Sequence, residues 1–310
     1  MDWDAVWKHI AWLGKELRAK EIDAADVCSE VSYALLRLAA ASPKQLNEGK
    51  NHIAKLLGID NFDRWIEEVI KACDPATQYK ITLFYSAACV LGSEYSTAMH
   101  IWSYAVTESR PPEAQFEAID ASAAPEYDSA SVHLRACRSF MDFLRPSLEG
   151  KNDFIDLCCG TGLTTEHLQL ADKRVVGIDL ELDGLRANGR TSLFSALHQG
   201  DAQAILPSLP AASFDAIWCC GAAYFFSDLS WIFSEASRLL RPGGVLSMNV
   251  WPSPENMDVS ITKGGTFRYC HSKGYLMRCA EAAGMCLAQT RWGLTYNMPT
   301  WYMIFEKHGG

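Results

Sequence analysis

Residues 154–162 constrain the fold of this chain more than any other stretch, and they read Phe-Ile-Asp-Leu-Cys-Cys-Gly-Thr-Gly. An apolar run that contains Asp156 leads into a turn of small residues, and a helical pattern follows from Leu163 to Leu170. This order predicts a buried β-strand, a turn with glycines and the start of a helix. Because Gly160 and Gly162 have no side chain, a ligand can approach the backbone there, next to the unpaired N–H groups of the helix start.

The turn also narrows the class of ligand. A dinucleotide site is expected to show Gly-x-Gly-x-x-Gly, with a pyrophosphate at the helix start. This turn has two glycines and an acid in the preceding strand. It therefore favours a ligand with a positively charged amino group and no phosphate.

Four further segments follow the same plan of an apolar run next to a polar or glycine-containing end. Arg174–Asp179 is predicted to be a second buried strand, and Asp179 falls where a doubly wound sheet places a carboxylate against ribose hydroxyls. The other three are a short run at 193–197 followed by Gly200-Asp201-Ala202, a strand at 214–218, and a helix end and turn at 239–244 that enter a strand at 245–251.

In this order and spacing, the five segments resemble class I S-adenosylmethionine-dependent methyltransferases over roughly residues 127–308. The resemblance implies an α/β fold with a three-layer, doubly wound, seven-stranded and mostly parallel sheet. Its last strands would lie near 287–292 and 301–305, one of them antiparallel. The cofactor would be S-adenosyl-L-methionine. A narrower resemblance, carried by Tyr127-Asp128 and by residues 267–272 (Phe-Arg-Tyr-Cys-His-Ser), is to predicted bacterial methyltransferases that carry a tetratricopeptide repeat.

The resemblance also implies roles for three acids. Asp156 would help hold the methionine amino group, directly or through water. Binding of the N–H groups of the turn is the alternative role, and the two roles are compatible. Asp179 would accept hydrogen bonds from both ribose hydroxyls, which suits the two oxygens of a carboxylate. Asp201 would accept from the adenine amino group, with the Ala202 N–H facing a ring nitrogen. The full set of predicted cofactor contacts is Asp156, Cys159, Gly160, Thr161, Gly162, Asp179, Leu180, Asp201, Ala202 and Cys219.

The first candidate for a catalytic residue is His271, which lies between a long loop at 252–267 and a predicted helix. A general base is needed only if the acceptor must lose a proton early. A structural hydrogen bond is the alternative role for this histidine. Tyr127 and His133 are weaker candidates on the segment 127–148, which by resemblance folds over the cofactor as a lid.

Two other groups of side chains lie at the predicted strand ends. Cys158-Cys159 and Cys219-Cys220 are expected to end neighbouring strands, so that up to four thiols approach the cofactor. Small apolar packing is the usual role of cysteine, and a nucleophile, a metal ligand or a redox sensor are the alternatives. Tyr224, Phe225 and Trp251 are expected either to wall a substrate pocket or to pack in the core.

Composition excludes several classes of partner. The net charge is −9 without a cluster of Lys and Arg, so we expect no nucleic-acid partner. No segment reaches the roughly 18–20 apolar residues that span a bilayer, and the N-terminus lacks a signal-peptide pattern. We therefore expect no membrane partner and a cytoplasmic location. The 11 cysteines include no Cys-x-x-Cys pair, which favours free thiols over disulfides or a metal site.

A chain of 310 residues favours two domains. Residues 1–122 are predicted to be all-α, and residues 123–310 to form the methyltransferase domain. Residues 92–111 nearly fit one tetratricopeptide repeat, but a single repeat has no neighbour to bury its faces, and an ordinary helical bundle is the alternative. The helices are expected at about 3–17, 23–41, 43–57, 61–72, 76–91 and 95–109.

These observations predict methyl transfer to an oxygen or nitrogen of a small-molecule acceptor, in specialised metabolism. The chain lacks the Asn-Pro-Pro-aromatic and Pro-Cys motifs after its fourth strand, which disfavours methylation of DNA bases. One alternative is a peptide or protein methyltransferase that recruits its substrate through the helical domain. Another is a non-catalytic interaction protein that binds the cofactor. A homodimer through the helical domain is also expected.

Overall fold

The contacts within the chain divide it into two units. Unit 1 comprises Met1–Arg110, Ser260–Phe267 and Asn297–Pro299, and unit 2 comprises Pro111–Val259, Arg268–Tyr296 and Thr300–Gly310. The computed structural model describes residues 2–108, 131–264 and 268–309. Over these ranges, no helix is both long and apolar enough to cross a membrane.

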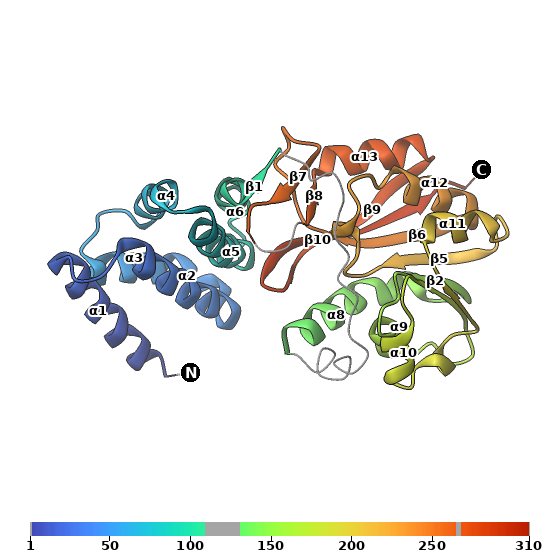
Figure 1. Ribbon diagram of the computed structural model, residues 1–310, viewed down its shortest axis with the longest axis horizontal. Coiled ribbons are helices and arrows are strands. Elements are labelled where there is room, and N and C mark those ends of the chain that lie inside the picture. Colours follow the sequence, from blue (N-terminus) through green and yellow to red (C-terminus); the bar gives the residue numbers. More distant parts are fainter. Residues whose placement is uncertain (1, 109–130, 265–267, 310) are drawn as a thin grey trace. The chain divides into compact units, whose positions relative to one another are not determined.

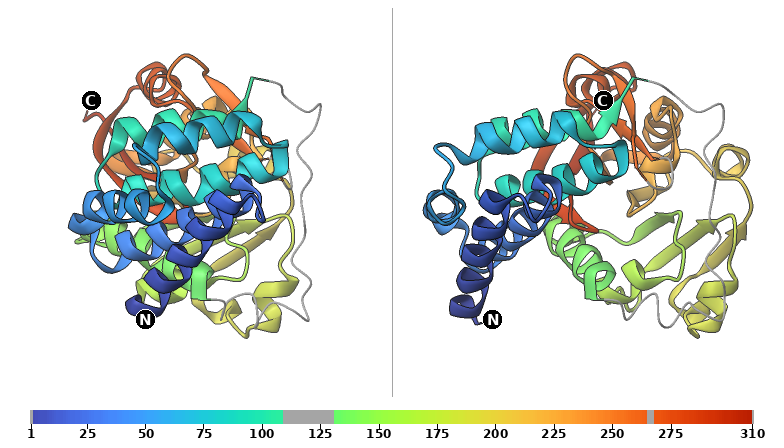
Figure 2. Two further views of the ribbon diagram at one scale, coloured as in Figure 1. Left: turned by 90° about the vertical axis from the view of Figure 1, so that its left-hand side faces the viewer. Right: turned by 60° about the vertical axis from the view of Figure 1, so that its left-hand side comes forward.

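Unit 1 is built mainly from helices that pack side by side (Figure 2). Asp2, Asp23 and Asp74 each accept a hydrogen bond from the first turn of the helix that follows them, because the first N–H groups of a helix have no partner inside it. The helical segments are α1 (Trp3–Ala19), α2 (Ala24–Ala41), η1 (Pro43–Gln45), α3 (Leu46–Leu57), α4 (Phe62–Ala72), α5 (Pro75–Leu91), α6 (Tyr95–Trp102) and η2 (Ser103–Ala105).

The prediction of one helix over 95–109 is wrong at its C-terminal end. After η2 the chain forms a short strand, β1 (Val106–Thr107), which pairs antiparallel with β7 (Val259–Thr262). The β-branched side chains of Val106 and Thr107 favour a strand. The partner strand is distant in the sequence, so local periodicity could not reveal the pairing.

Unit 2 contains a seven-stranded sheet in the order β4-β3-β2-β5-β6-β10-β9. The strands β4, β3, β2, β5 and β6 run parallel, and β10 runs antiparallel to β6. The predicted doubly wound, mostly parallel sheet of seven strands is therefore confirmed. The strands are β2 (Asp153–Leu157), β3 (Arg174–Asp179), β4 (Ala196–Gln199), β5 (Phe214–Cys219), β6 (Leu240–Val250), β9 (Met285–Thr295) and β10 (Met298–Lys307).

Helices cover both faces of this sheet (Figure 1). The first face carries α8 (Ser131–Leu144), α9 (Leu163–Leu168) and α10 (Asp183–Ala187), and the second carries α11 (Ala202–Ile205), α12 (Ser230–Leu239) and α13 (Lys273–Ala282). Side chains along each strand alternate between the two faces. In β2, Phe154 packs in the first core, whereas Ile155 and Leu157 pack in the second. The same alternation directs Asp156 toward the α9 side.

The strand order reverses at β2, since β3 and β4 extend the sheet to one side of it and β5 and β6 to the other. In open parallel sheets, ligands bind beyond the carboxyl ends of the strands at such a switch point. The topology therefore directs attention to the turns that follow β2, β3 and β5.

Candidate functional site

The turn between β2 and α9 leaves open space above its backbone. Cys158, Gly160 and Gly162 have positive φ angles of 59°, 51° and 79°, in the left-handed region that favours glycine. A Cβ atom added at Gly160 would meet no other atom within 4 Å. The backbone at Gly160 is therefore open on the side where a side chain would stand.

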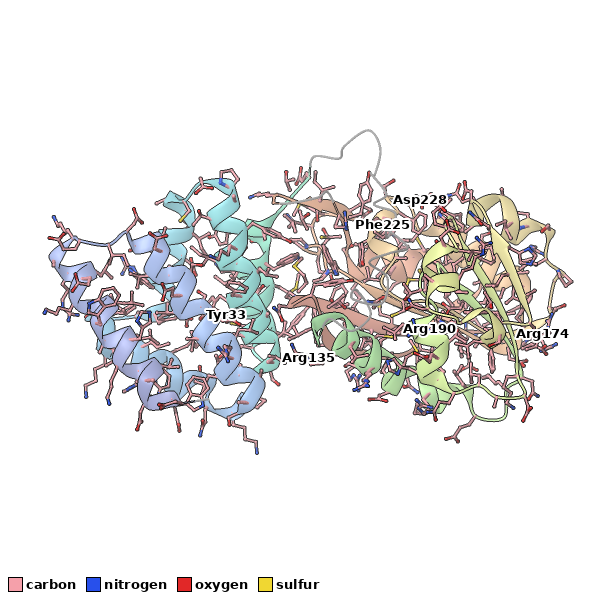
Figure 3. All side chains as sticks on the ribbon, turned by 60° about the horizontal axis from the view of Figure 1, so that its bottom comes forward. Tyr33, Arg135, Arg174, Arg190, Phe225 and Asp228 are labelled. Atoms are coloured by element: carbon pink, nitrogen blue, oxygen red, sulfur yellow. The ribbon has the colours of Figure 1, made fainter. Side chains whose placement is uncertain are left out.

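Arg190 holds this turn in place (Figure 3). Its Nη1 donates to the carbonyl oxygen of Thr161 at 3.1 Å, and its Nη2 donates to the carboxylate of Glu166 on α9 at 2.7 Å. A side chain at Gly162 would come within 3.3 Å of Arg190. Sequence analysis missed Arg190 because these contacts join separate segments and no motif marks them.

Asp156 is buried below the turn, with 1% of its surface exposed. Its Oδ2 accepts hydrogen bonds of 2.7 Å from the hydroxyls of Thr164 and Thr165, in the first turn of α9. Among the described residues, its Oδ1 has no hydrogen-bond partner. Burial raises the pKa of Asp156 to about 7, against the opposing effect of the two threonine hydroxyls and of the neighbouring Trp218. A cation near this carboxyl would stabilise its charged form.

The two threonine hydroxyls are partners of Asp156 that the sequence analysis did not name. The carboxylate binds their hydroxyls, whereas the sequence suggested that it could bind the N–H groups of the turn. The sequence did contain a signal for this contact, because two neighbouring threonines stand at the predicted start of the helix.

Asp179 ends β3 beside the same turn. Its Oδ2 accepts the Gly160 N–H at 2.7 Å, and its Oδ1 accepts the Glu181 N–H at 3.1 Å. Burial raises the pKa of Asp179, and these N–H groups oppose the shift. The next residue, Leu180, keeps 41% of its surface exposed. The structure therefore brings Gly160 and Asp179 together, with an apolar side chain next to them.

Asp201 begins the helix that follows β4. Its Oδ1 accepts the Gln203 N–H at 2.9 Å, which makes it the N-cap of α11, and the following Ala202 is buried. Asp179 pairs with Gln199 across β3 and β4. Asp201 therefore lies just beyond the end of β4, at the same edge of the sheet as Asp179.

The sheet separates the cysteines into two groups. Cys158 and Cys219 pack in the core on the α11–α13 face, whereas Cys137, Cys159 and Cys220 pack on the α8–α10 face. The Cys219 thiol beside Cys158, together with burial, raises the pKa of the Cys158 thiol. The Cys137 thiol, together with burial, likewise raises the pKa of the Cys220 thiol. Protonated thiols are weak nucleophiles and weak metal ligands. Among the described residues, no group of three or more His, Cys, Asp or Glu side chains is arranged to hold a metal ion.

His271 lies in β8 (Tyr269–His271), inside the core of unit 2. Its side chain is fully buried, and its ring stacks on Tyr275 of α13 with the centroids 5.6 Å apart. Its backbone N–H donates to the carbonyl oxygen of Trp251 at 2.9 Å. Tyr127 lies outside the described residues, and so does the side chain of His133. A role for these three residues in catalysis stays a prediction.

Aromatic side chains and one arginine gather at the carboxyl ends of β5 and β6. Tyr224, in η6 (Ala223–Phe225), packs on Trp251 with the ring centroids 4.7 Å apart, and both are buried. The Arg268 guanidinium lies 4.6 Å from the centre of the Phe225 ring and 5.7 Å from that of Tyr224. The aromatic residues were expected either to wall a pocket or to pack in the core. Arg268 belongs to the motif at 267–272, but its place over the rings could not be predicted, because a cation over an aromatic ring leaves no local sequence pattern.

Residues 155–248, from β2 to β6, match the family model described as a methyltransferase domain. This segment is therefore similar to a methyltransferase domain, in agreement with the resemblance that the order of its motifs carries. It contains the turn at Gly160 as well as Asp156, Asp179 and Asp201.

Curated relatives match the chain over the same region. The chain is 30% identical over 131 residues to the trans-aconitate 2-methyltransferase of Azoarcus sp. (strain BH72), covering 42% of this chain and 49% of the relative. It is 32% identical over 145 residues to the malonyl-[acyl-carrier protein] O-methyltransferase of Dechloromonas aromatica (strain RCB), covering 45% of this chain and 52% of the relative. The chain thus spans about half the length of these relatives.

Solved structures with a similar fold share little sequence. A Burkholderia thailandensis 1,6-didemethyltoxoflavin-N1-methyltransferase with bound S-adenosylhomocysteine matches with a TM-score of 0.48 and 15% identity, covering 66% of this chain and 95% of that one. An amino pentose methyltransferase from Micromonospora echinaspora matches with a TM-score of 0.46 and 19% identity, covering 64% of this chain and 100% of that one.

Proposed function

We propose that this protein transfers the methyl group of S-adenosyl-L-methionine to an oxygen or nitrogen of a small-molecule acceptor. The observation that carries the proposal is the open turn at Gly160, with the Asp179 carboxylate beside it and the buried Asp156 below it. These groups lie inside the segment that matches the methyltransferase domain. One curated relative is named for trans-aconitate, a small acid, which supports a small acceptor. Another is named for malonyl-[acyl-carrier protein], in which the acceptor is carried on a protein.

The residues of the turn fit this cofactor. The two oxygens of Asp179 suit the two ribose hydroxyls, and the exposed Leu180 offers an apolar surface to the adenine ring. Asp201 and Ala202 would serve the polar edge of the adenine. Asp156, whose Oδ1 has no hydrogen-bond partner among the described residues, places a potential negative charge below the turn for the charged methionine end.

The remaining predicted contacts with the cofactor lie in the turn after β2 and at the end of β5. They are Cys159, Thr161, Gly162 and Cys219.

When bound, the cofactor supplies a methyl group that is already activated on a sulfonium. The protein must then orient the acceptor and exclude water. Tyr224, Phe225 and Trp251 provide an apolar wall for that purpose. For an acceptor that loses a proton, His271 stays the proposed base, with His133 and Tyr127 as the weaker candidates.

Calorimetric titration with S-adenosylmethionine tests the cofactor site. Asp179→Ala is expected to weaken binding roughly tenfold to a hundredfold, because a hydrogen bond to a charged group contributes roughly 1.5–3 kcal/mol. Asp183→Ala is the matched control, since Asp183 lies on α10, is 62% exposed and contacts Arg186 at 2.8 Å. If Asp179→Ala binds the cofactor as tightly as the parent protein, the site assignment is wrong.

A groove on unit 1 favours a second candidate, a peptide or protein methyltransferase that recruits its substrate through the helical region. The groove has a volume of about 510 Å³ and is lined by α1 and α2, including Val6, Ile10 and Leu13. Tyr33 at the groove is 43% exposed, with the Arg37 guanidinium 5.6 Å from its ring centre (Figure 3). In this case Tyr33→Ala would lower turnover of a peptide acceptor and leave turnover of a free small molecule unchanged.

Other features of the organisation remain proposals. The first is the division of the chain into residues 1–122 and 123–310, and the second is the kinship with methyltransferases that carry a tetratricopeptide repeat. A homodimer through the helical region and the absence of a nucleic-acid partner are two more. The last two are the cytoplasmic location and the setting in specialised metabolism. Sedimentation at several concentrations tests the dimer. Tight cofactor binding without turnover of any acceptor would favour the non-catalytic alternative.

A further inference from the structure

We propose that Arg190 is a positioning residue for the cofactor. Its guanidinium fixes the turn between β2 and α9 through the Thr161 carbonyl, and the affinity for S-adenosylmethionine depends on that contact. This inference rests on the proposed methyltransferase function and adds a residue that prepares the same site. It also gives the two glycines of the turn different roles.

Two side chains of opposite charge hold the backbone of the turn. The Asp179 carboxylate accepts the N–H of Gly160 at 2.7 Å. The Arg190 guanidinium donates from Nη1 to the carbonyl oxygen of Thr161, the next residue, at 3.1 Å. Hydrogen bonds to charged groups are stronger than those between neutral groups. Together the two contacts restrain the peptide unit before Gly160 and the peptide unit after Thr161.

The Arg190 side chain is fixed by a second acceptor. Only 12% of it is exposed, and its Nη2 donates to the carboxylate of Glu166 in α9 at 2.7 Å (Figure 3). One planar guanidinium therefore joins the turn to the helix that follows it. The rigid fork of an arginine can hold two acceptors in this way, whereas the ammonium of a lysine is a single point of charge.

The backbone of Arg190 is positioned by the end of α10. Gly189 follows this helix with a φ of 67°, and a left-handed glycine is a common way to end a helix. The Arg190 N–H then donates to the carbonyl oxygen of Leu185 at 3.2 Å. Asp179 ends β3, and α10 is the next helix in the chain. Both residues that hold the turn therefore come from one strand–helix segment.

The two glycines of the turn have different neighbours. A Cβ atom added at Gly162 would lie 3.3 Å from the Cβ and Cδ atoms of Arg190 and 3.4 Å from the ring of Phe194. A Cβ atom added at Gly160 would meet nothing within 4 Å. Sequence analysis treated both glycines as places where a ligand can approach the backbone. The missing side chain at Gly162 instead makes room for Arg190, and only Gly160 leaves open space.

A turn that is fixed in advance favours binding. A ligand that must order the backbone of its site loses part of its binding free energy, and a site already held in place avoids that loss. Removal of the guanidinium would release the Thr161 carbonyl from Arg190 and separate the turn from Glu166. Arg190 therefore acts on the cofactor through the turn.

The test is calorimetric titration of the full chain with S-adenosylmethionine and with S-adenosylhomocysteine, at a temperature where thermal unfolding shows each variant to be folded. Arg190→Ala should raise the Kd roughly tenfold. Arg190→Lys should raise it roughly threefold, because it keeps the charge and loses the fork. Glu166→Ala should also weaken binding, since Glu166 orients Arg190. The double variant of Arg190→Ala with Glu166→Ala should bind like Arg190→Ala alone, because contacts that act as a unit are not additive.

Arg145→Ala is the matched control. The Arg145 guanidinium also donates to the backbone of α9, at 3.0 Å to the carbonyl oxygen of Leu168 and at 2.8 Å to that of His167. These carbonyls lie at the end of α9 that is distant from the turn. Arg145→Ala should lower the unfolding temperature and keep the parent's affinity for the cofactor. A purely structural role of Arg190 would give the same result for Arg190→Ala.

The outcomes separate this inference from the proposed function. A parent protein that binds the cofactor, with a folded Arg190→Ala variant of equal affinity, overturns the role of Arg190 and leaves the proposed function standing. If Arg190→Ala does not fold, Glu166→Ala decides, and an affinity equal to that of Arg145→Ala overturns the inference. A parent protein that binds neither S-adenosylmethionine nor S-adenosylhomocysteine overturns both.

Discussion

Asp156→Asn should stabilise the cofactor-free protein at alkaline pH. The Asp156 carboxyl is 1% exposed and has a pKa of about 7, compared with its usual 3.8. Between these values the folded protein holds a proton that the unfolded chain has lost, so stability falls as pH rises through this window. The difference between the two pKa values corresponds to roughly 4 kcal/mol once pH is well above 7. The groups around Asp156 include Thr164 and Thr165 on α9, Trp218 on β5, the Asp179 carboxylate and the thiols of Cys159 and Cys220.

The parent should therefore lose roughly 3 kcal/mol of unfolding free energy between pH 5 and pH 8 through this one group. The Asn side chain does not ionise and can still accept from the threonine hydroxyls, so its variant should lack that part of the pH dependence. Urea titrations followed by tryptophan fluorescence at both pH values measure the free energy of unfolding of each protein. Asp183→Asn, at an exposed site, should retain the parent's pH dependence.

Under the proposed function, the same substitution should weaken cofactor binding, since it removes the negative charge that we assign to the methionine end. A stabilised protein that binds S-adenosylmethionine poorly would be the expected signature. Equal pH dependence of stability in the parent and in Asp156→Asn would refute the reasoning, because it would mean that the buried carboxyl does not titrate in this window.

Two further substitutions test the site. Gly160→Ala should weaken S-adenosylmethionine binding at least tenfold by calorimetry, because the added methyl group enters open space and φ there is 51°, where an L-residue costs roughly 1–2 kcal/mol. Unchanged affinity would mean that no ligand atom occupies that space. Cys220→Ser should keep the parent's turnover of any acceptor, since burial and the Cys137 thiol hold Cys220 protonated. A large loss of turnover with normal cofactor affinity would instead indicate a thiol in the reaction.

The strands that carry the cofactor turn could be predicted well from the sequence. Their apolar runs are short, buried on both faces and closed by acids, and β3 has the predicted bounds Arg174–Asp179. The segment at 193–197 was less accurate, because β4 is Ala196–Gln199 and residues Thr191–Leu193 form the 3₁₀ turn η4. β4 is an edge strand whose side chains are only partly buried, so its apolar pattern is weak.

Features that depend on distant pairing could not be predicted. The expected loop at 252–267 contains β7, whose partner β1 lies near the end of the helical segments. The turn predicted at residues 241–244 is part of the strand β6, which holds Gly243 at φ 74° and carries a register irregularity against β5. Arg190 was missed for the same reason, since its hydrogen bonds join residues from other segments.

Cys158 shows how the tertiary structure settles a question that the sequence left open. It has a φ of 59°, which costs an L-residue roughly 1–2 kcal/mol. Its side chain is partly buried and packs in the core on the α11–α13 face, with the Cys219 thiol beside it. Burial of a small apolar side chain can offset a strain of that size. Because Cys159 and Cys220 pack on the other face, the sheet prevents the four thiols from meeting. The cysteine pairs therefore join β2 and β5 to their two cores, and small apolar packing, the usual role of cysteine, accounts for their position.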